Sequence, residues 1–190
     1  MQPIEPLMRE HRLILRMVEL MRRELERLRS NVAVDPEFAF VDPAFIDLAV
    51  DFLRTYADRC HHGKEEELLF AALAGRDLQS DLKKLLEELI EEHERAREYT
   101  RELIRAKEAY LREEKEAVNR VLCYLDKLTA MYPKHIIKED QHFFIPLMEY
   151  FSPEEKEALL AQMWDFDRQL IHERYEEVVA GMENRRACRL

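Results

Sequence analysis

Three glycines in 190 residues leave this chain few places to turn. Leu, Glu, Arg, Lys and Ala, which all favour helices, make up much of the remainder. Because a β-sheet needs turn residues that are scarce here, the sequence predicts an all-α fold. The length is that of one ordinary domain, which can bury a hydrophobic core without disulfides.

Apolar residues recur at spacings of three and four along most of the chain, the period of helices with one core-facing side. Together with the loop and cap signals, this pattern predicts five helices, over about residues 6–30, 42–73, 77–111, 114–150 and 152–182. Residues 31–41 are expected to form a loop. The tail from Glu183 to Leu190 is expected to fray.

Capping residues support two of these helix starts. Asp42 followed by Pro43 is an N-cap with a proline in the first turn. Ser152 with Pro153 and Glu155 has the pattern of a capping box with a first-turn proline. The second and fifth helices should therefore begin at these residues.

The expected architecture is a single domain in two parts. Residues 1–150 should form an up-down-up-down four-helix bundle, the simplest topology for helices joined by short connections. Residues 151–190 should add a fifth helix, packed on the bundle, and a short tail. A weak internal repeat relates the two halves of the bundle, because His61-x-x-Lys64-Glu65 matches His135-x-x-Lys138-Glu139.

Charge and cysteine content exclude several classes of function. The formal net charge of −10 argues against a nucleic-acid-binding surface, which needs a basic patch. Cys60, Cys123 and Cys188 match neither a disulfide framework nor a cysteine metal motif, which favours a reducing compartment. The sequence shows no secretory signal and no membrane span, so we expect a soluble cytoplasmic protein. No protein partner is indicated, and the oligomeric state stays open between monomer and homodimer.

Four histidines are expected to meet at one height in the bundle. His11 lies about 19 residues before the end of the first helix, and His61 about 18 residues after the start of the second. Since both helices share a loop, the two histidines should be level. The same count places His93 level with His61, and His135 level with His93, within about one turn.

Two carboxylates should join this layer. Glu65 lies four residues after His61, and Glu139 four residues after His135, so each pair projects from one helix face. Imidazole and carboxylate together suit iron, manganese or zinc better than calcium or magnesium. Six such groups exceed the needs of one ion, so two ions are expected. Glu65 and Glu139 would bridge them, and an oxo, hydroxo or exogenous oxygen ligand would complete the bridge.

The motifs that carry these residues resemble those of one family. They are Glu10-His11, the block from Cys60 to Glu66, Glu92-His93, and His135-x-x-Lys138-Glu139-Asp140. Together they resemble the hemerythrin-like, or HHE cation-binding, domains from about Leu7 to Tyr150. The resemblance implies an oxygen-reactive non-haem di-iron centre. Its terminal ligands would be His11, His61, His93 and His135, and its bridging ligands would be Glu65 and Glu139.

The chain departs from the oxygen-carrying members of that family at one position. Those members have a second histidine four residues after the third-helix ligand, where this chain has Arg97, which cannot ligate. This substitution argues against reversible oxygen carriage. His62 is a candidate replacement, because some relatives place an extra ligand directly after the second-helix histidine. The alternative is that His62 lies outside the centre.

Other polar residues near the motifs are expected to have ordinary roles. His142 lies about 10 Å along the helix axis from His135, too far for the same centre, and His172 should be a surface or structural histidine. Tyr56 and Tyr132 should pack in the core. The acidic residues next to the candidate ligands are Glu10, Glu66, Glu92 and Asp140. They could orient ring N–H groups, but most acidic residues on such helices face water.

The favoured function is a di-iron protein that binds or reacts with oxygen, peroxide or nitric oxide; an enzymatic activity of the peroxidase or oxidase type is left open. An alternative is an oxygen- or redox-sensing module that signals to a protein partner through the fifth helix. A ferritin-like iron oxidase or storage protein ranks last, because the Glu-x-x-His pattern is absent. Three residues before His61, His93 and His135 stand Asp58, Ile90 and Tyr132.

Overall fold

The computed structural model describes residues 1–35, 39–167 and 171–187. The first two helical rods are α1 (Ile4–Val34), and α2 (Pro43–Phe52) continued by η2 (Leu53–His62), η3 (Glu65–Phe70) and η4 (Ala71–Leu73). The next two are α3 (Ser80–Leu111), and α4 (Ala117–Ile137) continued by η5 (Lys138–Phe143), α5 (Phe144–Leu147) and η6 (Met148–Tyr150). The chain then forms α6 (Pro153–Phe166) and α7 (Ile171–Ala187).

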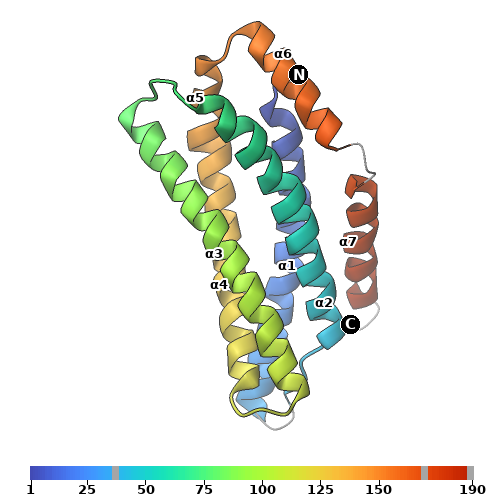
Figure 1. The fold of residues 1–190 in the computed structure, drawn as a ribbon. Helices are drawn as coiled ribbons and strands as arrows, with labels where there is room; N and C mark the ends of the chain where they lie inside the picture. The colour runs from blue at the N-terminus through green and yellow to red at the C-terminus, as the bar shows by residue number, and fades with distance from the viewer. Residues whose placement is uncertain (36–38, 168–170, 188–190) are drawn as a thin grey trace.

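The four rods run up, down, up and down, as the sequence predicts (Figure 1). α3 packs on α4, α4 on α1, and the α2–η2 rod on both α3 and α1, so the rods close into a bundle. α6 lies at the end of the bundle that holds the N-terminus, and α7 runs along its outside (Figure 1). α7 contacts α1 and η2, and α6 contacts η3. The all-α bundle with a C-terminal helical addition is confirmed.

The predicted caps are present at both helix starts. The side chain of Asp42 accepts hydrogen bonds from the backbone N–H groups of Ala44 and Phe45. Ser152 and Glu155 form the reciprocal capping box at the start of α6. These short-range signals depend only on neighbouring residues, which is why the sequence reveals them.

The C-terminal part differs from the prediction. The expected single helix over residues 152–182 is wrong, because α6 ends at Phe166 and α7 begins at Ile171, with residues 168–170 outside the described chain. Asp167, directly after α6, accepts a hydrogen bond from the buried Lys64, a tertiary contact at the helix end that the sequence does not show. α7 continues to Ala187, so the fraying expected from Glu183 is also wrong there; residues 188–190 lie outside the described part.

Two other boundaries shift by a few residues. α1 continues to Val34, past the expected end near residue 30, and residues 36–38 of the expected loop are outside the description. α4 begins at Ala117 rather than near residue 114. Glu113 and Glu116, just before it, adopt left-handed backbone conformations with φ of 57° and 61°, which delays the helix.

A polar layer divides the hydrophobic interior into two clusters. On α1, Ile4 and Leu7 belong to one cluster, Leu13 and Met17 belong to the other, and His11 lies between them. The other rods show the same order, with Leu89 and Ala96 of α3 on either side of His93. The layer is therefore enclosed by apolar packing above and below.

The rods are wider where they cross this layer. η2, η3 and η5 are π-helical stretches, in which each backbone hydrogen bond spans five residues instead of four. The helical pattern of the sequence does not predict them. η2 ends with His61 and His62, η3 begins with Glu65, and η5 contains Glu139. Such turns are rare and concentrate at functional sites.

Within its described residues, the chain has no helix with the length and apolar character that a membrane span requires.

Candidate metal centre

The residues that the helical register brings to one height lie together in the structure. The six side chains come from six different elements and each is at most 3 % exposed; they are His11, His61, Glu65, His93, His135 and Glu139. The ring centroids of His11 and His61 are 4.6 Å apart, and those of His93 and His135 are 4.9 Å apart. The layer therefore contains two pairs of histidines with the two carboxylates among them.

Each carboxylate faces both pairs. Oε1 of Glu65 lies 3.5 Å from Nε2 of His61, and Oε2 lies 3.4 Å from Nε2 of His93. Oε2 of Glu139 lies 3.1 Å from Nε2 of His11, and Oε1 lies 3.1 Å from Nε2 of His135. One oxygen of each glutamate thus belongs to each half of the layer, which is the arrangement of a bridging ligand.

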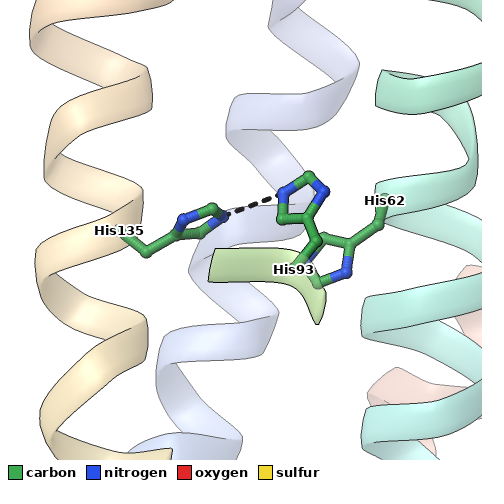
Figure 2. Close-up of side chains that lie close together, drawn as sticks. All are labelled: His62, His93 and His135. Carbon is green, nitrogen blue, oxygen red and sulfur yellow. Dashed lines mark hydrogen bonds between the residues drawn. The ribbon is translucent and has the colours of Figure 1, made fainter. Parts of the chain in front are cut away.

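In the layer, potential ligand atoms form two groups, and within each group the atoms lie within 4.8 Å of one another. The first group consists of His11, His61, Glu65 and Glu139, and the second of His62, His93 and His135. Figure 2 shows the second group, whose members come from three different helical rods. Nε2 of His93 and Nε2 of His135 are 3.2 Å apart, and the ring of His62 stacks on His93 with centroids 3.8 Å apart.

An outer ring of four carboxylates holds the four principal histidines. Each carboxylate sits next to a candidate ligand in sequence and bonds Nδ1 of the histidine on the following rod, so the ring closes around the bundle. The Nδ1–oxygen distances are 2.8 Å for His61–Glu10, 2.7 Å for His93–Glu66, 2.9 Å for His135–Glu92 and 2.8 Å for His11–Asp140.

This ring sets which nitrogen of each histidine can bind a cation. An ionised carboxylate only accepts hydrogen bonds, so Nδ1 must carry the proton and donate it. The bonds from His135 and Lys138 hold the pKa of Glu92 at about 2 although burial opposes its ionisation. Nε2 is then the nitrogen that points into the layer and is left to bind a cation.

Two lysines hold the outer ring in matching ways. Nζ of Lys64 donates to Oε1 of Glu10, whose other oxygen accepts from His61. Nζ of Lys138 donates to Oε1 of Glu92 at 2.6 Å, whose other oxygen accepts from His135. The sequence repeat therefore corresponds to a repeated set of hydrogen bonds, lysine to glutamate to histidine, with one set in each half of the bundle.

The C-terminal segment covers one of these two sets. Nζ of Lys64 also donates to Oδ1 of Asp167 at 2.7 Å, and the lysine is fully buried. The side chain of Lys138 keeps 28 % of its surface exposed. The two halves of the centre therefore differ in their outer contacts.

Unpartnered polar atoms mark the inside of the layer. In the described part of the chain, six buried side-chain atoms have no hydrogen-bond partner: Nε2 of His11, Nδ1 of His62, and both oxygens of Glu65 and of Glu139. The 3.1 Å contact between His11 and Glu139 lacks hydrogen-bond geometry. Each such atom costs about 1 to 3 kcal/mol. Cations would satisfy the inward-facing atoms, and nitrogen with carboxylate oxygen suits iron, manganese or zinc.

The ionisable groups of the metal-free layer are strongly shifted. Burial and the charge of Glu139 raise the pKa of Glu65 well above its ordinary value. Burial opposes the ionisation of Glu139 as well, but His135 and His11 hold its pKa well below the ordinary value. Without a cation, protonation is thus favoured at Glu65 and ionisation at Glu139.

The pKa values of the histidines are also shifted in opposite directions. Although burial lowers it, the hydrogen bond to Asp140 and the nearby charge of Glu139 raise the pKa of His11 to about 9. Against the same burial, Glu139 and Glu92 raise the pKa of His135 to about 10. Burial and the neighbouring His11 lower the pKa of His61 to about 4. Protons on His11 and His135 therefore supply the positive charge that a bound cation would replace.

Arg97 takes part in the outer ring and not in the layer. Its Nε donates to Oδ1 of Asp58 and its Nη2 to Oε1 of Glu66, both at 2.7 Å. His62, one turn after Asp58, occupies the group with His93 and His135 instead. His62 therefore lies among candidate ligand atoms, whereas Arg97 does not.

The remaining residues lie largely as expected. His142 is exposed, and Tyr56 and Tyr132 are buried. His172 is structural, because its Nδ1 bonds the hydroxyl of Tyr56 at 3.0 Å and its Nε2 lies 3.2 Å from Asp167. Burial raises the pKa of the Cys60 thiol to about 12, which keeps it inert.

The outer carboxylates are the functional residues that the sequence did not single out. Most were expected to face water, with the alternative that they orient ring N–H groups, and all four bond candidate ligands. Their position next to a ligand in sequence was a signal, since a neighbouring residue on a helix points about 100° away, toward the adjacent rod. That signal repeats four times in this chain.

A family model described as the hemerythrin HHE cation binding domain matches residues 2–147. The match includes every residue of the layer and ends before α6 and α7. No curated protein and no solved structure matches the chain.

Proposed function

The chain belongs to the hemerythrin HHE cation-binding family, and from this we propose that it holds two iron ions and binds or reacts with oxygen, peroxide or nitric oxide. The proposal rests on two carboxylates that each face both halves of the histidine layer. Glu65 and Glu139 each present one unpartnered oxygen to each half of a buried histidine layer. Two bridged cations would satisfy all four of these buried carboxylate oxygens.

The contacts support a division of the proposed ligands between the two ions. One ion would be held by His11 and His61, and the other by His62, His93 and His135. Glu65 and Glu139 would contribute one oxygen to each. Manganese or zinc would suit the same donors, and the choice of iron rests on the family.

The two positions would differ in the number of protein ligands. The His11–His61 position has two histidines, whereas the other has three, so the former is left with more room for an exogenous ligand. Iron with an open coordination position supplies redox chemistry toward small oxygen or nitrogen species. The protein excludes bulk water from this position by burying His11 and His61 to 1 % exposure.

Metal analysis with spectroscopy tests this proposal. The chain, purified without chelator, should contain about two irons. Its ultraviolet–visible spectrum should change when the reduced protein meets air, peroxide or nitric oxide. Protein that contains no transition metal after expression with iron supplied, and takes up none on reconstitution, would contradict the proposal.

A second candidate function is an oxygen or redox sensor, and one observation favours it. Asp167, after α6, bonds Lys64, which bonds Glu10, which bonds His61. This chain of bonds connects the C-terminal helices to the centre. Hydrogen exchange in α7 that changes when the centre is oxidised, in protein that does not turn over peroxide, would favour the sensor.

A further inference from the structure

A small cavity reaches the layer beside His62. Its volume is about 160 Å³, and its walls come from η2, α3 and α4, including Arg54, Asp58, His62, Arg97 and Arg101. Since a water molecule takes about 30 Å³ of the liquid, the cavity has room for a few small molecules. It is well below the 300 to 1,000 Å³ of pockets for organic ligands. Its occupant must therefore be small.

The cavity wall is rich in arginine in a chain whose net charge is −10. Arg97 is neutralised by Asp58 and Glu66. Arg54 and Arg101 are exposed at this wall, and neither forms an ion pair with any described residue. Two guanidinium groups therefore keep their charge and their donors for a ligand, and guanidinium groups pair best with planar oxyanions.

An unpartnered nitrogen lies deeper in the same cavity. Nδ1 of His62 is buried, makes no hydrogen bond, and is 3.5 Å from Oδ1 of Asp58, which also lines the cavity. The other four histidines of the layer each bond a carboxylate through Nδ1. His62 is thus the one histidine of the layer whose outer nitrogen is left for something else.

We propose that this cavity binds a small planar oxyanion such as nitrite, between the guanidinium groups of Arg54 and Arg101 and Nδ1 of His62. The anion would then lie next to the His62–His93–His135 side of the centre. Its role there rests on the proposed function, but the binding itself does not. The cavity adds a selective step, because it admits small anions and repels cations.

Titration of the full chain with sodium nitrite at constant ionic strength tests the inference. Isothermal calorimetry should detect one bound nitrite per chain. Replacing Arg101 by glutamine (Arg101→Gln) or Arg54 by glutamine (Arg54→Gln) should weaken binding about tenfold, since each removes a charge-assisted hydrogen bond. The matched control is Arg105→Gln, which removes the same charge from the same helix. Its side chain is 71 % exposed and bonds Glu102 away from the cavity, so binding should stay unchanged.

Three outcomes would overturn it: no nitrite binding, equal weakening by Arg101→Gln and Arg105→Gln, or citrate binding as tightly as nitrite. The last two would indicate general attraction to the surface, since citrate is too large for the cavity. Iron analysis of the same samples separates the two proposals. Iron-loaded protein that does not bind nitrite contradicts only this inference. Iron-free protein that binds nitrite supports this inference and contradicts the proposed function.

Discussion

At the scale of single residues, Glu139 joins the two halves of the layer. Its two oxygens lie 3.1 Å from Nε2 of His11 and of His135, and neither oxygen has a hydrogen-bond partner. A neutral amide of the same shape would keep the packing but remove the charge that two cations need. The contribution of Glu139 to metal binding can therefore be separated from its contribution to packing.

We expect Glu139→Gln to reduce the metal bound per chain to at most about half, because both proposed ions lose a ligand. Inductively coupled plasma mass spectrometry on purified protein measures this. Glu149→Gln is the control, since Glu149 is exposed and lies beyond the layer on the same rod. Equal metal content in both variants would argue against a bridging role.

Loss of a carboxylate of the outer ring should reduce metal binding less than the loss of Glu139. Glu92 holds His135 through Nδ1 and is itself held by Lys138. Glu92→Gln should lower metal affinity about 10- to 100-fold, the usual effect of losing such a partner, while the fold remains intact. A competition titration with a chelator of known affinity measures the change. Glu91→Gln, on the adjacent and exposed position, should leave affinity unchanged.

At the scale of helical elements, the C-terminal segment breaks the symmetry of the repeat. The Lys64–Glu10–His61 unit and the Lys138–Glu92–His135 unit have the same bonds. Only the first is sealed by Asp167 and by the packing of α7 on α1 and η2. The two motifs are equivalent in the sequence, and the C-terminal segment makes their outer contacts different.

We expect Asp167→Asn to loosen this segment, because the buried ammonium of Lys64 loses one of its two carboxylate partners. Hydrogen exchange should accelerate in α7 and at the start of α1, and stay unchanged in α3. Glu157→Gln, an exposed change on α6, is the control. If α7 exchanges at the same rate in both variants, Asp167 does not hold the segment in place.

At the scale of the whole molecule, the bundle encloses a charged layer between two hydrophobic clusters. Without cations, the layer depends on protons at His11 and His135, whose pKa values are about 9 and 10. A pKa raised above the unfolded value of about 6.5 stabilises the fold fully below that value. This stabilisation is lost as the pH rises through 9 to 10.

The metal-free protein should therefore have a lower melting temperature at pH 10 than at pH 7. Cation affinity should change in the opposite direction and rise about tenfold per pH unit for each displaced proton, because cations replace these protons. Differential scanning calorimetry and metal titrations at several pH values measure the two effects. The metal-loaded protein should melt at a higher temperature than the metal-free protein at pH 7. Metal affinity that does not vary between pH 6 and 9 would contradict this account.

The sequence alone determined the features that depend on local rules. The rise of a helix is constant, so counting residues from each loop was enough to bring His11, His61, His93 and His135 to one height. Capping at Asp42 and Ser152 involves only adjacent residues. The all-α class, the four-rod bundle and the composition of the layer were therefore predictable.

Only the tertiary structure decided what depends on how the rods face one another. The outer carboxylates bond histidines on neighbouring rods, the break after α6 places Asp167 on Lys64, and the cavity at His62 lies among three rods. The rotation of each rod about its axis sets these contacts, and side-chain packing across the interior sets that rotation. No local pattern in the sequence encodes it, because the contacting residues are separated by tens of positions in the chain.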